Sequence, residues 1–272
     1  MRLVSWNVQW CRGLDGVVDP ARIAGELRRL ADPDVACLQE VASDFPELAG
    51  SKSEDQPVAL WREMPEYEPV VGWAVDVAGA GRARKRFGNM ILSRLRVGRV
   101  LRHSLPWPAA PEVPTMPRGA VEAIVNAPFG PVRVVTTHLE YYSATHRAAQ
   151  VARLAELHQE WRAERKSVDE DGPFRSRPSP RSTIVCGDFN LPPQDPLHRA
   201  IRDIGFVDAW QALNPGVPHP PSFRVHERDA GESPYCCDFV FVTPDLAPRL
   251  ASIRIDAGNR ASDHQPVSVE LR

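Results

Sequence analysis

The feature that most restricts how this chain can fold is a series of short apolar runs, each of which ends abruptly in a polar residue. These runs and their polar ends are Val4–Trp6 with Asn7, Val35–Leu38 with Gln39 and Glu40, Val134–Thr137 with His138, and Ile184–Gly187 with Asp188 and Asn190. Runs of this length are typical of buried strands. Ligands of α/β folds bind at the carboxyl ends of strands, so we expect these polar side chains to converge.

Helical periodicity between the runs places the chain in the α/β class. Asp19 is expected to cap a first helix, with Pro20 at its first position and with one apolar face made by Ile23, Leu27 and Leu30. This helix lies between strands at Leu3–Val8 and Val35–Leu38. A strand–helix–strand opening of this kind favours an α/β fold.

The rest of the chain continues the same alternation. Further strands are expected at Gly88–Ser93, Ala120–Val125, Val132–Thr137, Thr183–Cys186, Cys236–Thr243 and Pro266–Leu271, and further helices at about Ser143–Lys166 and Pro196–Ile204. The segment Ser167–Arg181 is rich in Pro and Ser, and a Pro-rich loop spans roughly Asn214–Pro234. Polar strand ends with catalytic side chains lie on both sides of Ser167–Arg181 in the sequence. We therefore interpret residues 1–272 as a single domain with a flexible insertion near residues 167–182.

Composition excludes several classes of protein. The 272 residues carry 33 basic and 35 acidic side chains, a formal net charge of −2, so nucleic acid would have to be bound by a local patch. No run approaches the roughly 18 apolar residues that cross a membrane, and the N-terminus is not typical of a secretory signal. Five cysteines without a Cys-x-x-Cys pair favour neither a zinc ribbon nor a disulfide framework. We expect a cytoplasmic monomer.

The polar strand ends combine the groups needed for metal-assisted hydrolysis of a phosphate ester. Asn7, Glu40 and Asp263 offer the oxygen ligands that Mg²⁺ prefers, with Mn²⁺ as the alternative. Such hydrolysis also needs a base that orients water and donors for the phosphoryl oxygens. Each residue by itself is more often a turn former or a solvated charge, so the prediction depends on the combination.

Seven motifs carry a resemblance to a known family. They are Ser-Trp-Asn-Val at 5–8, Leu-Gln-Glu at 38–40, Gly-Asn-x-Ile-Leu-Ser at 88–93, Thr-His-Leu at 137–139, Gly-Asp-Phe-Asn at 187–190, Asp-Phe-Val-Phe at 238–241 and Ser-Asp-His-x-Pro at 262–266. In this order they resemble the endonuclease/exonuclease/phosphatase (DNase I-like) superfamily over nearly the whole chain. The resemblance implies a four-layer α/β sandwich, in which two mixed β-sheets pack together and helices flank them.

The resemblance also implies a role for each matched position. These roles are metal binding at Asn7, Glu40 and Asp263, orientation or deprotonation of the attacking water at Asp188 with Asn190 beside it, phosphate contacts at His264 and His138, orientation of the His264 imidazole at Asp238, and support of the substrate at Asn89 and Arg118. Many relatives have a basic residue just before the aspartate that matches Asp238, where this chain has Cys236-Cys237. No covalent nucleophile is indicated, so direct attack by water is the simpler mechanism.

The substrate is left open between three hypotheses. The basic run Arg82–Arg86, taken as a flexible loop, could bind the backbone of DNA or RNA, and Trp107, Trp210 and Phe223 could stack on bases. Solvated arginines and packed aromatic rings are the simpler interpretations of the same residues. A nuclease or other phosphodiesterase is the first hypothesis, and a phosphoesterase for a small molecule or a lipid headgroup is the second. A silent binding module is disfavoured, because the complete acid and histidine set is present.

Overall fold

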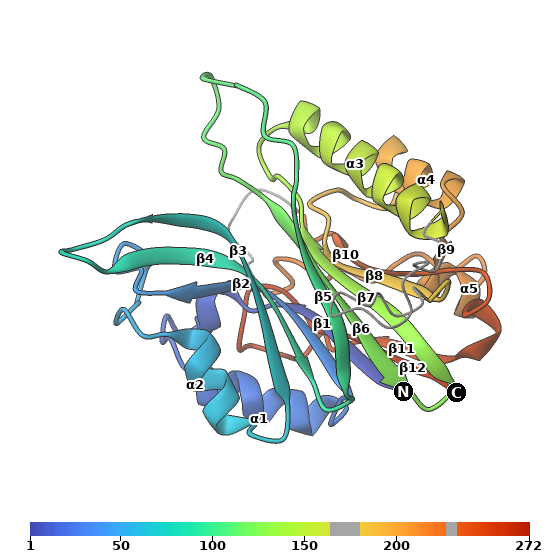
Figure 1. Ribbon diagram of the computed structural model, residues 1–272, viewed down its shortest axis with the longest axis horizontal. Coiled ribbons are helices and arrows are strands. Elements are labelled where there is room, and N and C mark those ends of the chain that lie inside the picture. The colour runs from blue at the N-terminus through green and yellow to red at the C-terminus, as the bar shows by residue number, and fades with distance from the viewer. Residues whose placement is uncertain (164–179, 227–232) are drawn as a thin grey trace, which may run out of the picture.

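The structure, a computed structural model, describes residues 1–163, 180–226 and 233–272. Two six-stranded sheets pack against each other, and helices cover their outer faces (Figure 1). The helices are α1 (Pro20–Leu30), α2 (Gln56–Glu63), α3 (Ala144–Ala163), α4 (Pro196–Asp203) and α5 (Ala209–Leu213), with short 3-10 turns η1 (Gln9–Cys11) and η2 (Ala247–Arg249). The predicted four-layer sandwich is confirmed.

The first sheet is built around the N-terminal strand. Its strand order is β11 (Leu250–Ile255), β12 (Val267–Leu271), β1 (Arg2–Asn7), β2 (Val35–Ser43), β4 (Arg84–Ser93) and β3 (Glu68–Ala78). Only β1 and β2 are parallel among these neighbours. The helices α1 and α2 lie on the outer face of this sheet (Figure 1).

The second sheet repeats this plan with one parallel pair at its centre. Its strand order is β5 (Val97–Ser104), β6 (Gly119–Ala127), β7 (Gly130–His138), β8 (Thr183–Asp188), β10 (Asp238–Val242) and β9 (Val207–Asp208). Here β7 and β8 are the parallel neighbours. The helices α3 and α4 lie outside it (Figure 1).

Three apolar cores explain why the central strands are continuous apolar runs. Leu3 packs into the core between the two sheets, whereas the next residue, Val4, packs into the core under α1. Val134 and Val135 divide in the same way between the inner core and the core under α3. Because successive side chains of a strand point to opposite faces, a strand covered on both sides needs apolar residues at nearly every position.

Helix starts follow the sequence signals. The Asp19 side chain accepts a 3.1 Å hydrogen bond from the backbone of Arg22, and Pro20 is the first residue of α1, as predicted. The long helix α3 begins at Ala144 and buries one apolar face, made by the four predicted residues Val151, Leu154, Leu157 and Trp161. It is assigned through Ala163, and its expected last residues lie outside the described part of the chain.

The sequence missed several elements and misjudged one segment. The strands β3, β5, β9 and β11 and the helices α2 and α5 were not predicted. The basic run was expected to be a flexible loop, which is wrong for residues 84–86, because these residues form the start of β4 and pair with β3. Of the expected insertion near residues 167–182, only 180–182 are described, so the insertion itself is outside the described residues.

Candidate active site

The carboxyl ends of central strands from both sheets meet in one cluster. Parallel pairing places Asn7 in β1 level with Gln39 in β2, and His138 in β7 level with Asp188 in β8. The antiparallel strand β10 begins at Asp238, which is also level with Asp188. Across the two sheets, Asn7 Nδ2 donates a 3.0 Å hydrogen bond to Asp188 Oδ2. The structure therefore brings the polar strand ends together, as the sequence predicts.

Glu40 enters this cluster through an irregularity in β2. The pairing of β2 with β4 shifts register between Leu38 and Val41, and Glu40 has a φ of 61°. Bulges of this kind redirect a side chain beside a site. The Glu40 carboxylate accepts a 3.0 Å hydrogen bond from Asn7 Nδ2. Burial and, after it, the charge of Asp263 raise the pKa of the Glu40 carboxyl to about 7.

Asp188 lies at the centre of the cluster. Its Oδ2 accepts from Asn7 and lies 3.4 Å from His138 Nε2 and 3.6 Å from His264 Nε2. Its Oδ1 accepts a 2.9 Å hydrogen bond from the backbone of Asn190, which fixes the carboxylate plane. Burial raises the pKa of the Asp188 carboxyl to about 6, although the nearby imidazole of His264 acts to lower it. A carboxylate with this pKa suits a base that accepts a proton from water.

The glycine before Asp188 is required by close strand packing. Gly187 has a φ of 141°, and a Cβ atom there would lie 1.9 Å from the backbone oxygen of Thr137 in β7. The motif Gly-Asp-Phe-Asn therefore needs glycine at its first position, because any side chain would push β8 away from β7.

His264 is held as a cation by a chain of hydrogen bonds. Its Nδ1 lies 2.9 Å from Asp238 Oδ2, and the hydroxyl of Ser222 donates to the same oxygen over 2.6 Å. The ring of Phe223 stacks on the imidazole with centroids 4.4 Å apart. Burial alone would lower the pKa of His264, but the carboxylates of Asp238 and Asp188 raise it well above its usual value. The charged ring can donate from Nε2 to a phosphoryl oxygen.

His138 stands on the opposite side of Asp188 and is neutral. Burial and, after it, the charge of Arg118 hold the pKa of His138 well below its usual value. Its Nε2 lies 3.0 Å from Asn190 Nδ2, and its Nδ1 lies 3.8 Å from Glu40 Oε1. The same Asn190 amide donates to the backbone oxygen of Leu139 over 2.9 Å, which fixes its orientation. His138 and Asn190 thus act as a rigid pair beside the carboxylates.

Arg118 and Asn89, the two positions expected to support the substrate, differ in their contacts. Arg118 is buried, and its Nε donates to the carboxylate of Glu140 over 3.3 Å, while its Nη1 has no hydrogen-bond partner among the described residues. A buried guanidinium nitrogen without a partner suits binding of an anionic group. Asn89 donates to the backbone oxygen of Gly119 over 3.0 Å and so joins the first sheet to the second. No hydrogen bond among the described residues links Asn89 to the cluster around Asp188.

The donors around Glu40 fit a hard divalent cation. The charge of Asp263 raises the pKa of Glu40, and the nearby charge of His264 only partly offsets it, so this edge of the site is rich in negative charge. The Asp263 carboxylate accepts a 2.7 Å hydrogen bond from Gln9 Nε2. The amide oxygen of Asn7 accepts from the backbone of Gln9, and its nitrogen faces the carboxylates. Glu40 and Asp263 would hold Mg²⁺. Asn7, the third predicted ligand, here uses its amide nitrogen to orient Glu40 and Asp188, so its role in metal binding stays a prediction.

Sequence reasoning missed several contacts of the site. Ser222 reaches Asp238 from a Pro-rich segment 16 positions away, and no pattern in the sequence indicates this contact. Phe223, considered as a base-stacking residue, stacks on His264 instead. Cys237 Sγ lies 3.5 Å from Asp238 Oδ2 and 3.9 Å from His264 Nδ1. Burial raises the pKa of this thiol well above its usual value, so Cys237 is a neutral neighbour.

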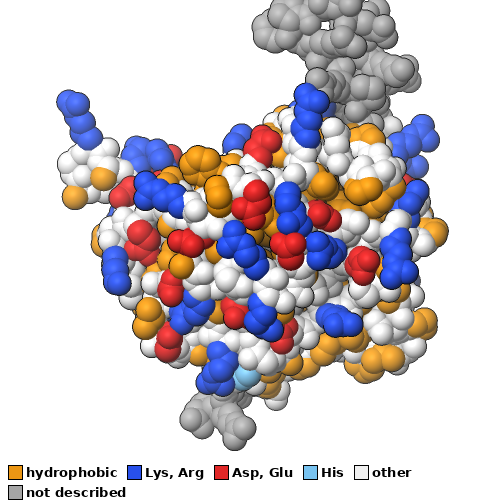
Figure 2. Space-filling view, turned by 90° about the horizontal axis from the view of Figure 1, so that it is seen from below, with side chains coloured by type: hydrophobic (Ala, Val, Ile, Leu, Met, Phe, Trp, Pro, Cys, Tyr) orange, Lys and Arg blue, Asp and Glu red, His pale blue; other side chains and the backbone are white. Residues whose placement is uncertain are grey.

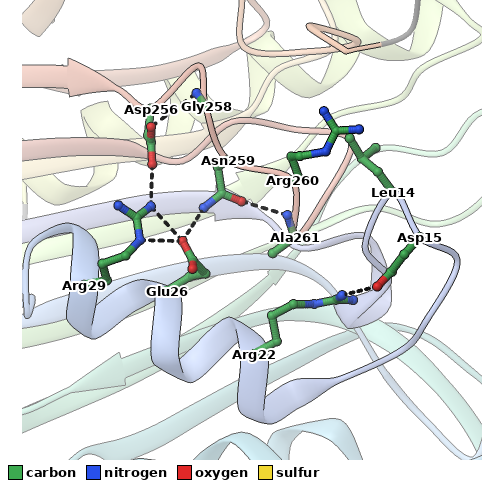
Figure 3. Close-up of a pocket in the computed structure, with 10 residues that line it drawn as sticks. All are labelled: Leu14, Asp15, Arg22, Glu26, Arg29, Asp256, Gly258, Asn259, Arg260 and Ala261. Atoms are coloured by element: carbon green, nitrogen blue, oxygen red, sulfur yellow. Dashed lines mark hydrogen bonds and ion pairs between the residues drawn. The ribbon is translucent and has the colours of Figure 1, made fainter.

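A separate hollow of about 650 Å³ lies between α1 and the segment that follows β11 (Figure 3). Most of its charged side chains form ion pairs with one another. Arg22 lies 2.7 Å from Asp15, and Arg29 lies 2.7 Å from both Glu26 and Asp256. None of the predicted site residues lines it. The residues expected to act on a phosphate ester therefore lie in the strand-end cluster and not in this hollow.

The basic run in β4 is largely neutralised by neighbouring acids. Arg84 donates to Asp76 over 2.5 Å, and Lys85 donates to Glu47 over 2.6 Å. On the face seen in Figure 2, basic and acidic side chains are likewise interspersed. These ion pairs therefore weaken the electrostatic argument that this segment binds a polyanion.

Among the described residues, no helix is long and apolar enough to cross a membrane.

Comparison with known proteins identifies the fold. The model described as "Endonuclease/Exonuclease/phosphatase family" matches residues 4–264. The chain is similar to the crystal structure of an endonuclease/exonuclease/phosphatase from Beutenbergia cavernae, with 25% identity, a TM-score of 0.74, and 100% of this chain and 71% of that one covered. None of the curated proteins matches the chain at a significant level.

Two further structures share the fold at lower identity. One is the 3′ phosphatase NExo from Neisseria bound to a product DNA hairpin, with 21% identity, a TM-score of 0.64, and 100% of this chain and 99% of that one covered. The other is the 3′-5′ exonuclease NExo from Neisseria meningitidis, with 21% identity, a TM-score of 0.63 and the same coverage.

Proposed function

Because the chain belongs to the endonuclease/exonuclease/phosphatase family and is a hydrolase acting on phosphate ester bonds, we propose that it is a nucleic-acid phosphodiesterase that uses a divalent metal and direct attack by water. The observation that carries this proposal is the central position of Asp188. Its Oδ2 lies 3.4 Å from His138 Nε2 and 3.6 Å from His264 Nε2, and the Asn7 amide that donates to it also donates to Glu40.

Each residue of the cluster has a separate role in the proposed reaction. Asp188 accepts a proton from the water whose oxygen attacks phosphorus, while the P–O bond to the leaving group breaks. The cationic ring of His264 neutralises charge on a phosphoryl oxygen, and Asp238 holds that ring in place. Mg²⁺ or Mn²⁺, bound by Glu40 and Asp263, supplies further positive charge when present.

A second cavity supports a nucleic-acid substrate. Its volume is about 280 Å³, and its lining includes Trp73, Arg102, Trp107 and Arg118. The charge of Arg118 also lowers the pKa of His138, so the cavity adjoins the active site. Aromatic rings with guanidinium groups suit a stacked base and its phosphate. The solved structures of NExo, one of them bound to DNA, favour the same substrate class.

A phosphoesterase for a small molecule or a lipid headgroup is the second candidate. It is favoured by the ion pairs that neutralise Arg84 and Lys85, and by the net charge of −2. A protein without a strong positive field gains little general attraction to DNA.

The deciding experiment is a substrate screen of the purified protein after exhaustive chelation, followed by Mg²⁺ or Mn²⁺ add-back. The substrates are 3′-phosphorylated, nicked and abasic DNA, RNA, phosphoinositides, sphingomyelin and an aryl phosphate. We expect no turnover without metal, and a kcat/KM for one of the nucleic acids at least about a hundredfold above that for the aryl phosphate. Full turnover by the metal-free protein would contradict the metal-dependent mechanism. A preference for a lipid or an aryl phosphate would favour the second candidate.

We propose that residues 1–272 form a single domain, that the protein is monomeric and that it is cytoplasmic. Size-exclusion chromatography with light scattering checks the second of these.

A further inference from the structure

A second cluster of metal-type donors lies away from the Glu40 edge of the active site. It consists of His198 in α4, Asp208 at the end of β9 and His219 in the segment after α5. The Nε2 atom of His198 lies 2.8 Å from Asp208 Oδ2, and the Nε2 atom of His219 lies 2.9 Å from the same oxygen. Three segments of the chain therefore direct two imidazole nitrogens and one carboxylate oxygen to one point.

The cluster is buried and its carboxylate is fixed. Side-chain exposures are 1% for His198, 2% for Asp208 and 5% for His219. The second oxygen of Asp208 accepts a 3.0 Å hydrogen bond from the backbone of Gln211, so the side chain cannot turn away. Fixed ligands of this kind lower the entropic cost of binding an ion.

An apolar shell surrounds the two imidazoles. The ring of Phe239 lies 4.8 Å from that of His198 and 5.4 Å from that of His219, measured between centroids. Trp210 lies 6.1 Å from the His219 ring. An apolar shell restricts water and strengthens ligand–metal interactions inside it.

A very small cavity adjoins the cluster. Its volume is about 10 Å³, close to the minimum that holds one water molecule, and its lining includes Asp208, His219 and Asp238. Asp238 Oδ1 is buried and has no hydrogen-bond partner among the described residues. Buried carboxylate oxygens are normally paired, so this atom indicates a missing donor. A metal-bound water in the cavity would have an acceptor available.

We propose that His198, Asp208 and His219 bind one zinc ion, with a water in the adjoining cavity as the fourth ligand. Two imidazoles, one carboxylate and one water form a donor set suited to tetrahedral Zn²⁺, whereas Mg²⁺ prefers six oxygens. Donor atoms of such a site are separated by about 3.3 Å when the bonds are about 2.0 Å. The observed distances of 2.8 and 2.9 Å need to open only slightly.

The zinc would secure a segment that supports the catalytic imidazole. His219 is followed by Ser222, which donates to Asp238, and by Phe223, which stacks on His264. The ion would therefore fix this segment against α4 and β9. It would be structural, because among the described residues none of its three protein ligands bonds to Asp188, His138 or His264, and only its bound water would approach Asp238.

The test uses the full-length protein, dialysed against excess Mg²⁺ after exposure to zinc, with bound zinc measured by mass spectrometry. We expect one zinc ion per chain in the wild type and the same in Glu40→Gln, which weakens the magnesium site. We expect at least about a tenfold weaker zinc affinity in His219→Gln. The glutamine amide can still donate to Asp208 but is a poor zinc ligand, so this variant separates metal binding from a purely hydrogen-bonded triad.

Cobalt gives an independent measurement that needs no variant. Co²⁺ in place of zinc should give the visible absorption of a tetrahedral ion without a thiolate charge-transfer band. A thiolate band would place the metal at Cys237 and overturn the proposal. Absence of zinc from the wild type, or undiminished affinity in His219→Gln, would also overturn it and leave Asp208 as a hydrogen-bonded link between two histidines.

Discussion

At the scale of single residues, the site depends on one carboxylate shared by several partners. Asp188 receives hydrogen bonds from Asn7 and from the backbone of Asn190, and it faces the rings of His138 and His264. Burial raises its pKa to about 6, so it is still largely ionised at neutral pH but is a stronger base than an exposed aspartate. Its function therefore depends on these neighbours as well as on its own charge.

We expect Asp188→Asn and His264→Ala each to lower kcat by at least about a hundredfold, since one removes the base and the other a charged donor. Asp203→Asn in α4 is the control, because Asp203 is 67% exposed and lies outside the site. Steady-state kinetics at saturating Mg²⁺, with circular dichroism to check folding, provides the measurement. Rates within about threefold of wild type would remove Asp188 and His264 from the mechanism.

At the scale of secondary structure, the site depends on how closely β7 and β8 approach each other. Gly187 permits this approach, because the backbone oxygen of Thr137 occupies the space where a side chain would begin. Gly25 in α1 provides a contrast, because no atom lies within 4 Å of a Cβ placed there. The same substitution should therefore have opposite effects at the two positions.

We expect Gly187→Ala to lower the free energy of unfolding by more than about 2 kcal/mol, because it adds backbone strain to a direct overlap. We expect Gly25→Ala to raise it by about 0.5–1 kcal/mol, because alanine loses less conformational entropy in a helix. Urea denaturation of both variants measures the difference. Equal stability of Gly187→Ala and the wild type would mean that β8 can move away from β7 without cost.

The sequence predicted the elements whose signals are local. Continuous apolar runs identified the central strands, and Asp19 with Pro20 identified the start of α1. Edge strands such as β3 and β5 were missed, because one of their faces is partly exposed and their apolar pattern is broken. Ser222 could not be predicted, since its contact with Asp238 depends on how a Pro-rich segment folds back. Arg84 was misjudged because its partner, Asp76, lies in the neighbouring strand.

At the scale of the whole molecule, one buried acid links the second sheet to the helix layer outside it. Glu122 in β6 is fully buried and accepts hydrogen bonds from Arg133 Nε over 2.9 Å and from Trp161 Nε1 over 3.0 Å. His103 Nε2 lies 2.9 Å from Oε2 of Glu122, the oxygen that also accepts from Trp161. These contacts join β5, β6 and β7 to α3. Burial acts to raise the pKa of Glu122, but the bonds from His103 and Arg133 outweigh it and lower the pKa to about 2.

This pKa predicts how acid affects stability. A carboxyl with a lowered folded-state pKa stabilises the protein fully above its unfolded value, and this stabilisation is lost as pH falls toward the folded value. We expect the contribution of Glu122 to decline between about pH 4.5 and about pH 2. Urea denaturation of the wild type and Glu122→Gln across this range checks it. The variant should be less stable by about 3–5 kcal/mol at pH 7, and the difference should narrow in acid. If the two free energies of unfolding differed by the same amount at every pH, the lowered pKa of Glu122 would be contradicted.

The hydrogen-bonding distance between Asn7 and His264, which are 257 positions apart, has a consequence for protein synthesis. A chain leaving the ribosome completes β1 and β2 first and β12 last. An unfinished or truncated chain that stops before His264 can hold Asn7, Glu40 and Asp188, but it has no imidazole next to Asp238. Such a chain carries an incomplete set of catalytic groups, however well its early strands have folded. Hydrolysis therefore requires a chain that extends through His264, and fragments that end before this residue are expected to be inactive.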